Sequence, residues 1–304
     1  MANLRDVHLR MRAVGQTLQV TKAMNLISTS KLRKGRRVLE DTEPFFTRVQ
    51  KSMYDILTGA EGITSRFFGG GKNSSGKYPG GRHSAVLAVT SDKGLAGGYN
   101  ANVFREVNRL CQDLASERGS APVLILIGAI GYRYFVHSPH VILENFSFRS
   151  KLPGMDNARE IADFVISQYL WGSFDEVYIV YTHMYNAVKL LPAVCQILPL
   201  SAEKVQEELT LSGGEKRVGL HFEYLPSEEA VFDALVPIYI KGIIYGCMVE
   251  SYASEQSARM SAMDEASKSA EEMLASFRLS YNRARQAGIT QEVTEIVSGS
   301  AALE

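Results

Sequence analysis

A glycine-rich turn is the first candidate for a functional site in the sequence. It spans residues 91–100 (SDKGLAGGYN) and lies between a buried apolar run, 84–90, and an amphipathic segment, 101–117. Free backbone amides at the start of a helix attract anions, so a turn of this kind can bind phosphate. The turn does not match GxGxxG, however, and no acidic residue follows at the place of a ribose ligand. The pattern therefore favours a tight structural turn in which Asn100 is the N-cap of the following helix.

The other candidates for chemistry are weaker. His137 and His140 have a spacing that occurs in metal sites, but no cysteine or carboxylate nearby completes a set. No serine sits in a nucleophile elbow, and no pair of carboxylates stands out. Cys111, Cys195 and Cys247 lie far apart, which predicts buried or inert thiols rather than disulfides. We therefore expect no catalytic site, no cofactor site and no metal site in this chain.

Charge and hydropathy exclude some classes of protein. The 304 residues include 33 Lys and Arg against 33 Asp and Glu, so no overall charge attracts nucleic acid or anionic lipid. Residues 1–37 nevertheless hold nine basic residues against one Asp, and residues 250–304 hold nine acidic against five basic residues. The first residues lack the apolar segment of a signal peptide. The most apolar window, 235–249, is short for a bilayer and contains Lys241, so we expect no direct membrane span.

A basic run, 31–37 (KLRKGRR), could contact nucleic acid or an acidic protein surface. It has no interleaved aromatic residues. On a helix its charges would cover most of the circumference, which is typical of a solvated face. We expect no nucleic-acid partner. The alternative, a coiled-coil nucleic-acid adaptor, predicts salt-dependent binding through this run.

Both ends of the chain have the apolar spacing of a coiled coil. The seam predicted near the C-terminus comprises Met263, Ala266, Ala270, Met273 and Phe277, then Tyr281 and Ala284, then Ile289, Val293 and Ile296. The seam predicted near the N-terminus comprises Leu4, Val7, Met11, Val14 and Leu18, the small or polar residues Thr21, Asn25 and Ser28, and then Leu32, Leu39, Phe46, Val49, Met53 and Ile56. Pro44 is expected to bend or interrupt the N-terminal helix.

The segment between the two helical ends has an α/β pattern. Strands are expected at 84–90, 122–127, 175–181 and 193–200, and helices at 101–117 and 157–171. A strand, a helix and a strand joined by short links predict a right-handed parallel βαβ unit. Residues 59–81 contain eight glycines, and residues 202–219 are polar and are expected to form a mobile hairpin or loop.

We therefore predict an α/β fold class, in which an antiparallel coiled coil of long N- and C-terminal helices carries an inserted Rossmann-like α/β domain. The predicted parts are an N-terminal coiled-coil helix at 1–57, a flexible Gly-rich loop at 58–82, a central α/β domain at 83–225 and a C-terminal coiled-coil helix at 226–304. Two helices packed separately on a core, or a dimer, remain as alternatives.

Three motifs resemble those of the gamma subunit of F-type ATP synthases. They are residues 20–32 (VTKAMNLISTSKL), the turn at 91–100, and residues 250–260 (ESYASEQSARM) together with 283–303. They occur in the family's order and span the whole chain. The sequence departs from the family at Ala96, often a cysteine, at Ser300, usually an alanine, and at 128–131 (GAIG), commonly a more basic stretch.

The resemblance implies a central rotor stalk without an active site of its own. Its coiled coil would turn inside a ring of alternating alpha and beta subunits, whose beta subunits hold the catalytic ATP sites. Its central domain would rest on the epsilon subunit and the membrane ring of c subunits. Rotation would couple ion flow to ATP synthesis or hydrolysis, in a peripheral complex at the cytoplasmic face of a bacterial membrane.

The resemblance also implies contact residues between stalk and ring. Lys22, Met24 and Arg259 would lie near an acidic hinge loop of beta, and Arg285, Gln286, Thr290 and Glu292 near the upper loops of the ring. The competing interpretation is a nucleotide-binding α/β enzyme with a coiled-coil dimerisation arm. It predicts tight nucleotide binding by the isolated chain at the glycine-rich turn.

Overall fold

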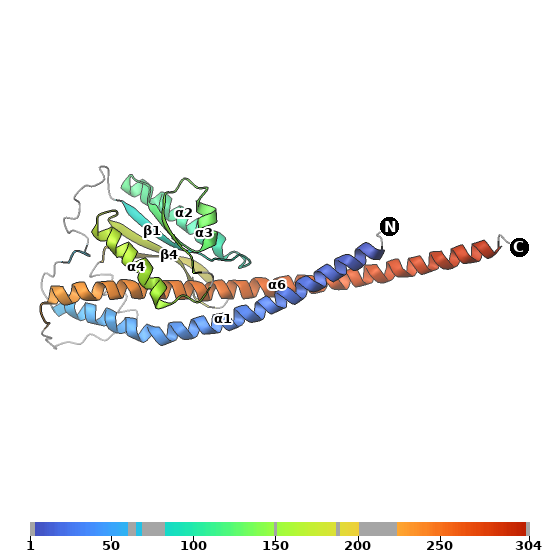
Figure 1. Ribbon diagram of the computed structural model, residues 1–304, viewed down its shortest axis with the longest axis horizontal. Coiled ribbons are helices and arrows are strands. Elements are labelled where there is room, and N and C mark those ends of the chain that lie inside the picture. The colour runs from blue at the N-terminus through green and yellow to red at the C-terminus, as the bar shows by residue number, and fades with distance from the viewer. Residues whose placement is uncertain are drawn as a thin grey trace. The chain divides into compact units, whose positions relative to one another are not determined.

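The computed structural model describes residues 4–59, 65–68, 83–148, 151–186, 189–200 and 224–301 (Figure 1). Most of the predicted flexible loop at 58–82, and all of the predicted hairpin or loop at 202–219, lie outside these residues. The chain forms two compact units. One comprises Met1–Thr29 and Arg259–Glu304, and the other comprises Ser30–Ala258.

Two long helices continue from one unit into the other. α1 spans Leu4–Gly59, and α6 spans Glu228–Ala301, 74 residues or ~110 Å at ~1.5 Å per residue. α1 continues through Pro44, so an interruption there is wrong, while a bend stays a prediction. Proline removes one helical hydrogen bond. The packing of Phe46 and Val49 in the hydrophobic core directly after Pro44 offsets that loss.

The α/β domain follows α1 in the chain. Its elements are β1 (Ser84–Val89), α2 (Tyr99–Arg118), β2 (Val123–Ile127), α3 (Ala129–Phe135), β3 (Ile142–Phe146), α4 (Met155–Leu170), β4 (Glu176–Met184) and β5 (Leu190–Leu198). The strand order is β3-β2-β1-β4-β5, with β5 antiparallel to β4 and every other neighbouring pair parallel. The parallel pairing expected for the first βαβ unit is therefore confirmed. Sequence analysis missed α3 and β3. It missed β3 because this is a half-exposed edge strand without a continuous apolar run.

Both faces of the sheet are covered. On β1, Val86 and Ala88 join a core cluster with α2, whereas Ala85, Leu87 and Val89 join a larger cluster with α4 and α6. This follows from the alternation of side chains along a strand. In Figure 1, α2 and α3 lie on one side of the sheet, and α4 and α6 lie on the other. β1 is buried along its whole length, as its unbroken apolar sequence predicts.

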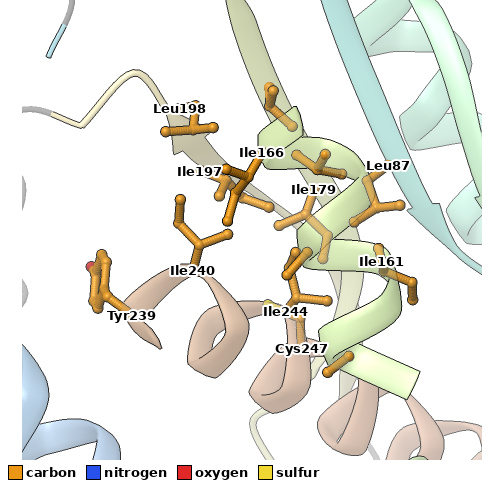
Figure 2. Close-up of a cluster of buried hydrophobic side chains, with 14 of the residues drawn as sticks. Leu87, Ile161, Ile166, Ile179, Ile197, Leu198, Tyr239, Ile240, Ile244 and Cys247 are labelled. Atoms are coloured by element: carbon orange, nitrogen blue, oxygen red, sulfur yellow. The ribbon is translucent and has the colours of Figure 1, made fainter. Parts of the chain in front are cut away.

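The apolar stretch of α6 packs into the second of these clusters. Figure 2 shows Tyr239, Ile240, Ile244 and Cys247 of α6 beside side chains from α4 and the strands. By length and composition alone α6 could cross a membrane, since an 18-residue window has a mean hydropathy of 1.5. Half of that window is buried inside the protein. Burial against the sheet accounts for the hydropathy of this stretch.

In the unit formed by the free ends of α1 and α6, the two helices pair antiparallel. Asn25 lies beside Met260, Thr21 beside Ser267, and the ring of His8 lies 5.9 Å from that of Tyr281. Residue numbers therefore rise along one helix as they fall along the other. The antiparallel coiled coil that the sequence predicts is confirmed.

The seam of α1 follows the prediction from Val7 onward, whereas Leu4 is 38% exposed. The α6 seam differs. Ser267 and Leu274 face inward, while the predicted Met273 is 46% exposed and Ala266 is only partly buried. The prediction was wrong at these two positions. Both choices alternate steps of three and four residues, so the spacing alone did not decide between them. The predicted continuation of the seam at Ile289, Val293 and Ile296 is also wrong, because these side chains are each at least half exposed. A serine belongs to this seam because its hydroxyl has a partner on α1.

That partner belongs to a short chain of hydrogen bonds. Ser267 Oγ donates to Thr21 Oγ1 at 2.8 Å, and Thr21 Oγ1 donates to the carbonyl oxygen of Leu18 at 3.0 Å. Asn25 Nδ2 donates to the carbonyl oxygen of Met260 at 3.1 Å. Buried polar groups at a coiled-coil seam favour the one register in which they are satisfied. We therefore expect this layer to fix the register of α1 on α6.

Two glycines one turn apart on α6 should respond in opposite ways to alanine. A methyl group on Gly242 would overlap with the ring of Phe46, whereas nothing lies within 4 Å of the same atom on Gly246. We expect Gly242→Ala to lower the free energy of unfolding by about 1–3 kcal/mol. Gly246→Ala should raise it by about 0.5–1 kcal/mol, because alanine favours helix. Urea denaturation of the chain measures both, and stabilisation by both alanines would contradict the close approach of Phe46.

Cysteine pairs test the register directly. Because the hydroxyl oxygens of Thr21 and Ser267 are 2.8 Å apart, Thr21→Cys with Ser267→Cys should form a disulfide on mild oxidation. The control combines Thr21→Cys with Leu274→Cys, one heptad or ~10 Å further along the axis. The cross-link is measured by gel mobility without reductant. Faster cross-linking of the control pair would mean that the register is one heptad away.

Candidate functional site

The C-terminal end of α6 exposes an apolar surface. Ile289, Val293, Ile296 and Val297 are each at least half exposed. Their spacing puts them on one face of the helix. α1 begins at Leu4, and its ring contact furthest along α6 is that of His8 with Tyr281. Among the described residues nothing covers this apolar stripe, and exposed stripes of this kind mark interaction surfaces.

The four predicted contact residues of this end are all exposed. They are Arg285, Gln286, Thr290 and Glu292. Thr290 Oγ1 donates to the backbone carbonyl oxygen of Gln286 at 2.9 Å, a bond within the helix. The side-chain amide of Gln286 does not take part in this bond. The residues therefore present charge and hydrogen-bonding groups beside the apolar stripe.

The other three predicted residues lie further down the coiled coil. Lys22 Nζ is 2.7 Å from Glu271 Oε1, and both side chains are more than half exposed, so this ion pair adds only about 0–1 kcal/mol. Met24 is half-buried, and Arg259 is buried. Arg259 precedes Arg285 by ~40 Å along α6 at ~1.5 Å per residue. The structure therefore places the seven residues in two groups rather than in one site.

The glycine-rich turn holds strand ends together. Asn100 Nδ2 donates to Ser91 Oγ at 2.7 Å, and the Ser91 amide donates to Asn100 Oδ1 at 3.1 Å. Helix α2 instead begins after Gly98, without a side-chain cap, so the predicted N-cap role of Asn100 is wrong. Asp92 Oδ1 accepts hydrogen bonds from the Ala129 amide and from Ser147 Oγ, each at 3.0 Å. These bonds tie the end of β1 to the ends of β2 and β3, which is a structural role.

A small hollow lies beside this turn. It measures about 40 Å³ and is lined by Thr90, Asp92, Gly128, Lys151 and Glu255, among others. Pockets for nucleotide-sized ligands are much larger, ~300–1,000 Å³. The hollow therefore gives no support to the interpretation of the chain as a nucleotide-binding enzyme.

The histidine and cysteine candidates have structural surroundings. His140 Nε2 lies 3.1 Å from Asn108 Oδ1, and burial lowers the pKa of His140. Cys111, Cys195 and Cys247 are free thiols. Burial raises the pKa of Cys111 to about 12, so this thiol stays protonated and unreactive at neutral pH. Within the described part of the chain, no three potential metal ligands come together.

Sequence reasoning missed a group of polar residues at the start of motif 250–260. Glu250, Ser251 and Ser254 contact the backbone of β4. Ser251 and Ser254 are almost completely buried. Polar residues on a face that is otherwise apolar were the available signal, since a buried hydroxyl needs a partner.

Known proteins resemble this chain over its full length. A family model described as ATP synthase matches residues 3–303. The ATP synthase gamma chain of Ruminiclostridium cellulolyticum is 40% identical over 302 residues, covering 99% of each chain. That of Acetivibrio thermocellus is 38% identical over 306 residues, covering 100% of each chain.

Solved structures agree with this relationship. A chain from the central stalk and c-ring of the Tetrahymena thermophila mitochondrial ATP synthase has a TM-score of 0.59 at 25% identity, covering 82% of this chain and 99% of that one. A chain from the Euglena gracilis mitochondrial ATP synthase has a TM-score of 0.67, covering 99% of this chain and 94% of that one. Its 17% identity shows the fold alone. By its full-length match to the family model and to its curated relatives, this chain belongs to the ATP synthase gamma chain family.

Proposed function

We propose that this chain is the rotor shaft of an F-type ATP synthase and has no catalytic site of its own. In this role it couples ion flow through a membrane ring to ATP synthesis or hydrolysis on the beta subunits. Its partners are the alpha and beta subunits around the coiled coil, and the epsilon subunit and c-ring against the α/β domain. The complex is peripheral, at the cytoplasmic face of a bacterial membrane.

The observation that carries the proposal is the exposed end of α6. An apolar stripe of Ile289, Val293, Ile296 and Val297 would cost solubility in a chain that acts alone. The surrounding polar residues are of the kind found at the rim of protein interfaces. A sleeve formed by other subunits would cover the stripe while still letting the helix turn.

Rotation acts through differential contacts. A ligand or partner shifts a conformational equilibrium only if it binds the two states unequally. The coiled coil has unlike faces: the exposed Lys22 comes from α1, whereas the exposed Arg285 comes from α6. Each beta subunit therefore meets different side chains at each angle of rotation. Arginine suits this task, since its planar guanidinium binds carboxylates in a defined direction.

Assembly with purified alpha and beta subunits tests the function. The full chain should form a large complex with ATPase activity, and a chain truncated after Ser280 should assemble more weakly or hydrolyse more slowly. Size-exclusion chromatography and a coupled ATPase assay measure both. A full chain that stays apart from the alpha and beta subunits would contradict the proposal.

Single substitutions test the contact residues at the exposed end. Arg285→Ala should lower ATP hydrolysis by the assembled complex roughly threefold to tenfold, the loss expected for one charge-assisted hydrogen bond. The free energy of unfolding of the chain should change by less than ~0.5 kcal/mol, because the side chain of Arg285 is exposed. Arg278→Ala, at an exposed position of the same helix, is the matched control and should leave hydrolysis near the unsubstituted rate. Equal losses in both variants would show a nonspecific effect of charge.

A further inference from the structure

Strand β4 extends beyond the end of its neighbour β1. The parallel pairing of these strands ends at Ala88 and Val180, whereas β4 continues to Met184. Over its last residues β4 pairs with β5, and Thr182 lies opposite Pro192. The amide and the carbonyl of Thr182 both bond to side chains of α6, so they point to the edge of β4 that faces away from β5. The pairing with β1 has already ended at that edge, so these two backbone groups need partners from another element.

Side chains of α6 supply hydrogen bonds at this edge. The Thr182 amide donates to Ser251 Oγ at 3.0 Å, and Ser254 Oγ donates to the Thr182 carbonyl oxygen at 3.1 Å. Two residues along the strand, the Met184 amide donates to Glu250 Oε1 at 3.1 Å. Alternate residues of a strand point their backbone groups to the same edge. β1 ends before it can form hydrogen bonds with this part of β4. The three side-chain bonds from α6 take the place of those missing strand-to-strand bonds.

These contacts are shielded from water. Thr182, Ser251 and Ser254 are each at most 3% exposed, so a lost hydrogen bond there leaves a buried group unsatisfied. The same oxygen of Glu250 lies 2.6 Å from Nδ1 of His183, which further positions the carboxylate. The bonds join the sheet to α6 within the unit Ser30–Ala258.

Hydrogen bonds restrain a helix differently from apolar packing. Apolar contacts are non-directional, so they resist rocking or sliding of a helix over a sheet only through the close packing of side chains. Hydrogen bonds to fixed backbone atoms have a preferred length and angle, so they resist both movements. A torque applied to the sheet would reach α6 through the packed core and, with a defined direction, through the bonds at Ser251, Ser254 and Glu250.

We propose that Glu250, Ser251 and Ser254 form a clamp that transmits torque between the α/β domain and α6. They are positioning residues for rotary coupling, and the inference rests on the function proposed above. Ion-driven synthesis sends torque through the α/β domain into the shaft. Hydrolysis by a complex of alpha, beta and gamma chains alone does not require that transfer.

The test compares these two activities for Ser251→Ala combined with Ser254→Ala. Hydrolysis by the alpha–beta–gamma complex should stay within about twofold of the unsubstituted chain, because the shaft ends are unchanged. ATP synthesis by the whole enzyme in vesicles, driven by an imposed ion gradient, should fall several-fold. Hydrogen exchange at the Thr182 amide should be about tenfold faster, as expected for one lost buried hydrogen bond. Ser261→Ala, at an exposed serine of the same helix, is the control and should change none of the three.

Other variants keep the proposal falsifiable if the double variant fails to fold. Ser251→Ala and Ser254→Ala alone should each show a smaller loss of synthesis with hydrolysis retained. Glu250→Gln keeps an oxygen that can accept from Met184 and should retain more synthesis than Glu250→Ala. Parallel losses of synthesis and hydrolysis, or unchanged synthesis with faster exchange at Thr182, would overturn the clamp. Failure of the unsubstituted chain to assemble with alpha and beta subunits would instead overturn the proposed function.

Discussion

The packing of α1 on α6 stabilises both long helices of the chain. A helix of 74 residues cannot bury its apolar face against a small α/β domain alone, and isolated helices are marginal in water. The two helices solve this by covering each other, and both compact units contain part of that pairing. Close approach is possible where a side chain is missing, as at Gly242 against the ring of Phe46.

Polar residues in the seam lower the stability of the coiled coil somewhat, but they define the register of α1 on α6. An apolar pair at Thr21 and Ser267 would bury more apolar surface, but apolar residues tolerate more than one register. Two bonds cross the seam, from Ser267 Oγ to Thr21 Oγ1 and from Asn25 Nδ2 to the Met260 carbonyl oxygen, and they form only where these residues lie opposite one another. For a shaft this matters more than a small gain in stability, because a rod whose helices slip cannot hold partners at defined angles.

Repetitive patterns in the sequence predicted the fold well. The apolar spacing of α1 and the continuous apolar runs of β1 and β2 were sufficient to predict these elements. In each case the residues that become buried can be recognised from the local sequence pattern. Ser267 was left out of the predicted seam because its partner, Thr21, lies on the other long helix and is not encoded by local spacing. Asn100 was assigned as an N-cap because its residue type alone did not show that its side chain bonds back to Ser91. β3 was missed because a half-exposed edge strand has a weak pattern. The contact residues came from motif resemblance, since exposed positions such as Arg285 carry no packing signal.

The family motif at 250–260 serves two needs that sequence alone does not separate. Ser251 and Ser254 face β4 within the unit that contains the sheet, whereas Arg259 already belongs to the unit of the helix ends. Within this one stretch, α6 changes from a helix hydrogen-bonded to the sheet to a helix paired with α1. Polar side chains are needed on both sides of that transition, because apolar packing alone would fix neither the sheet nor the register. For this reason most of the buried polar residues of α6 occur at 250–260, where the helix changes its packing partner from the sheet to α1.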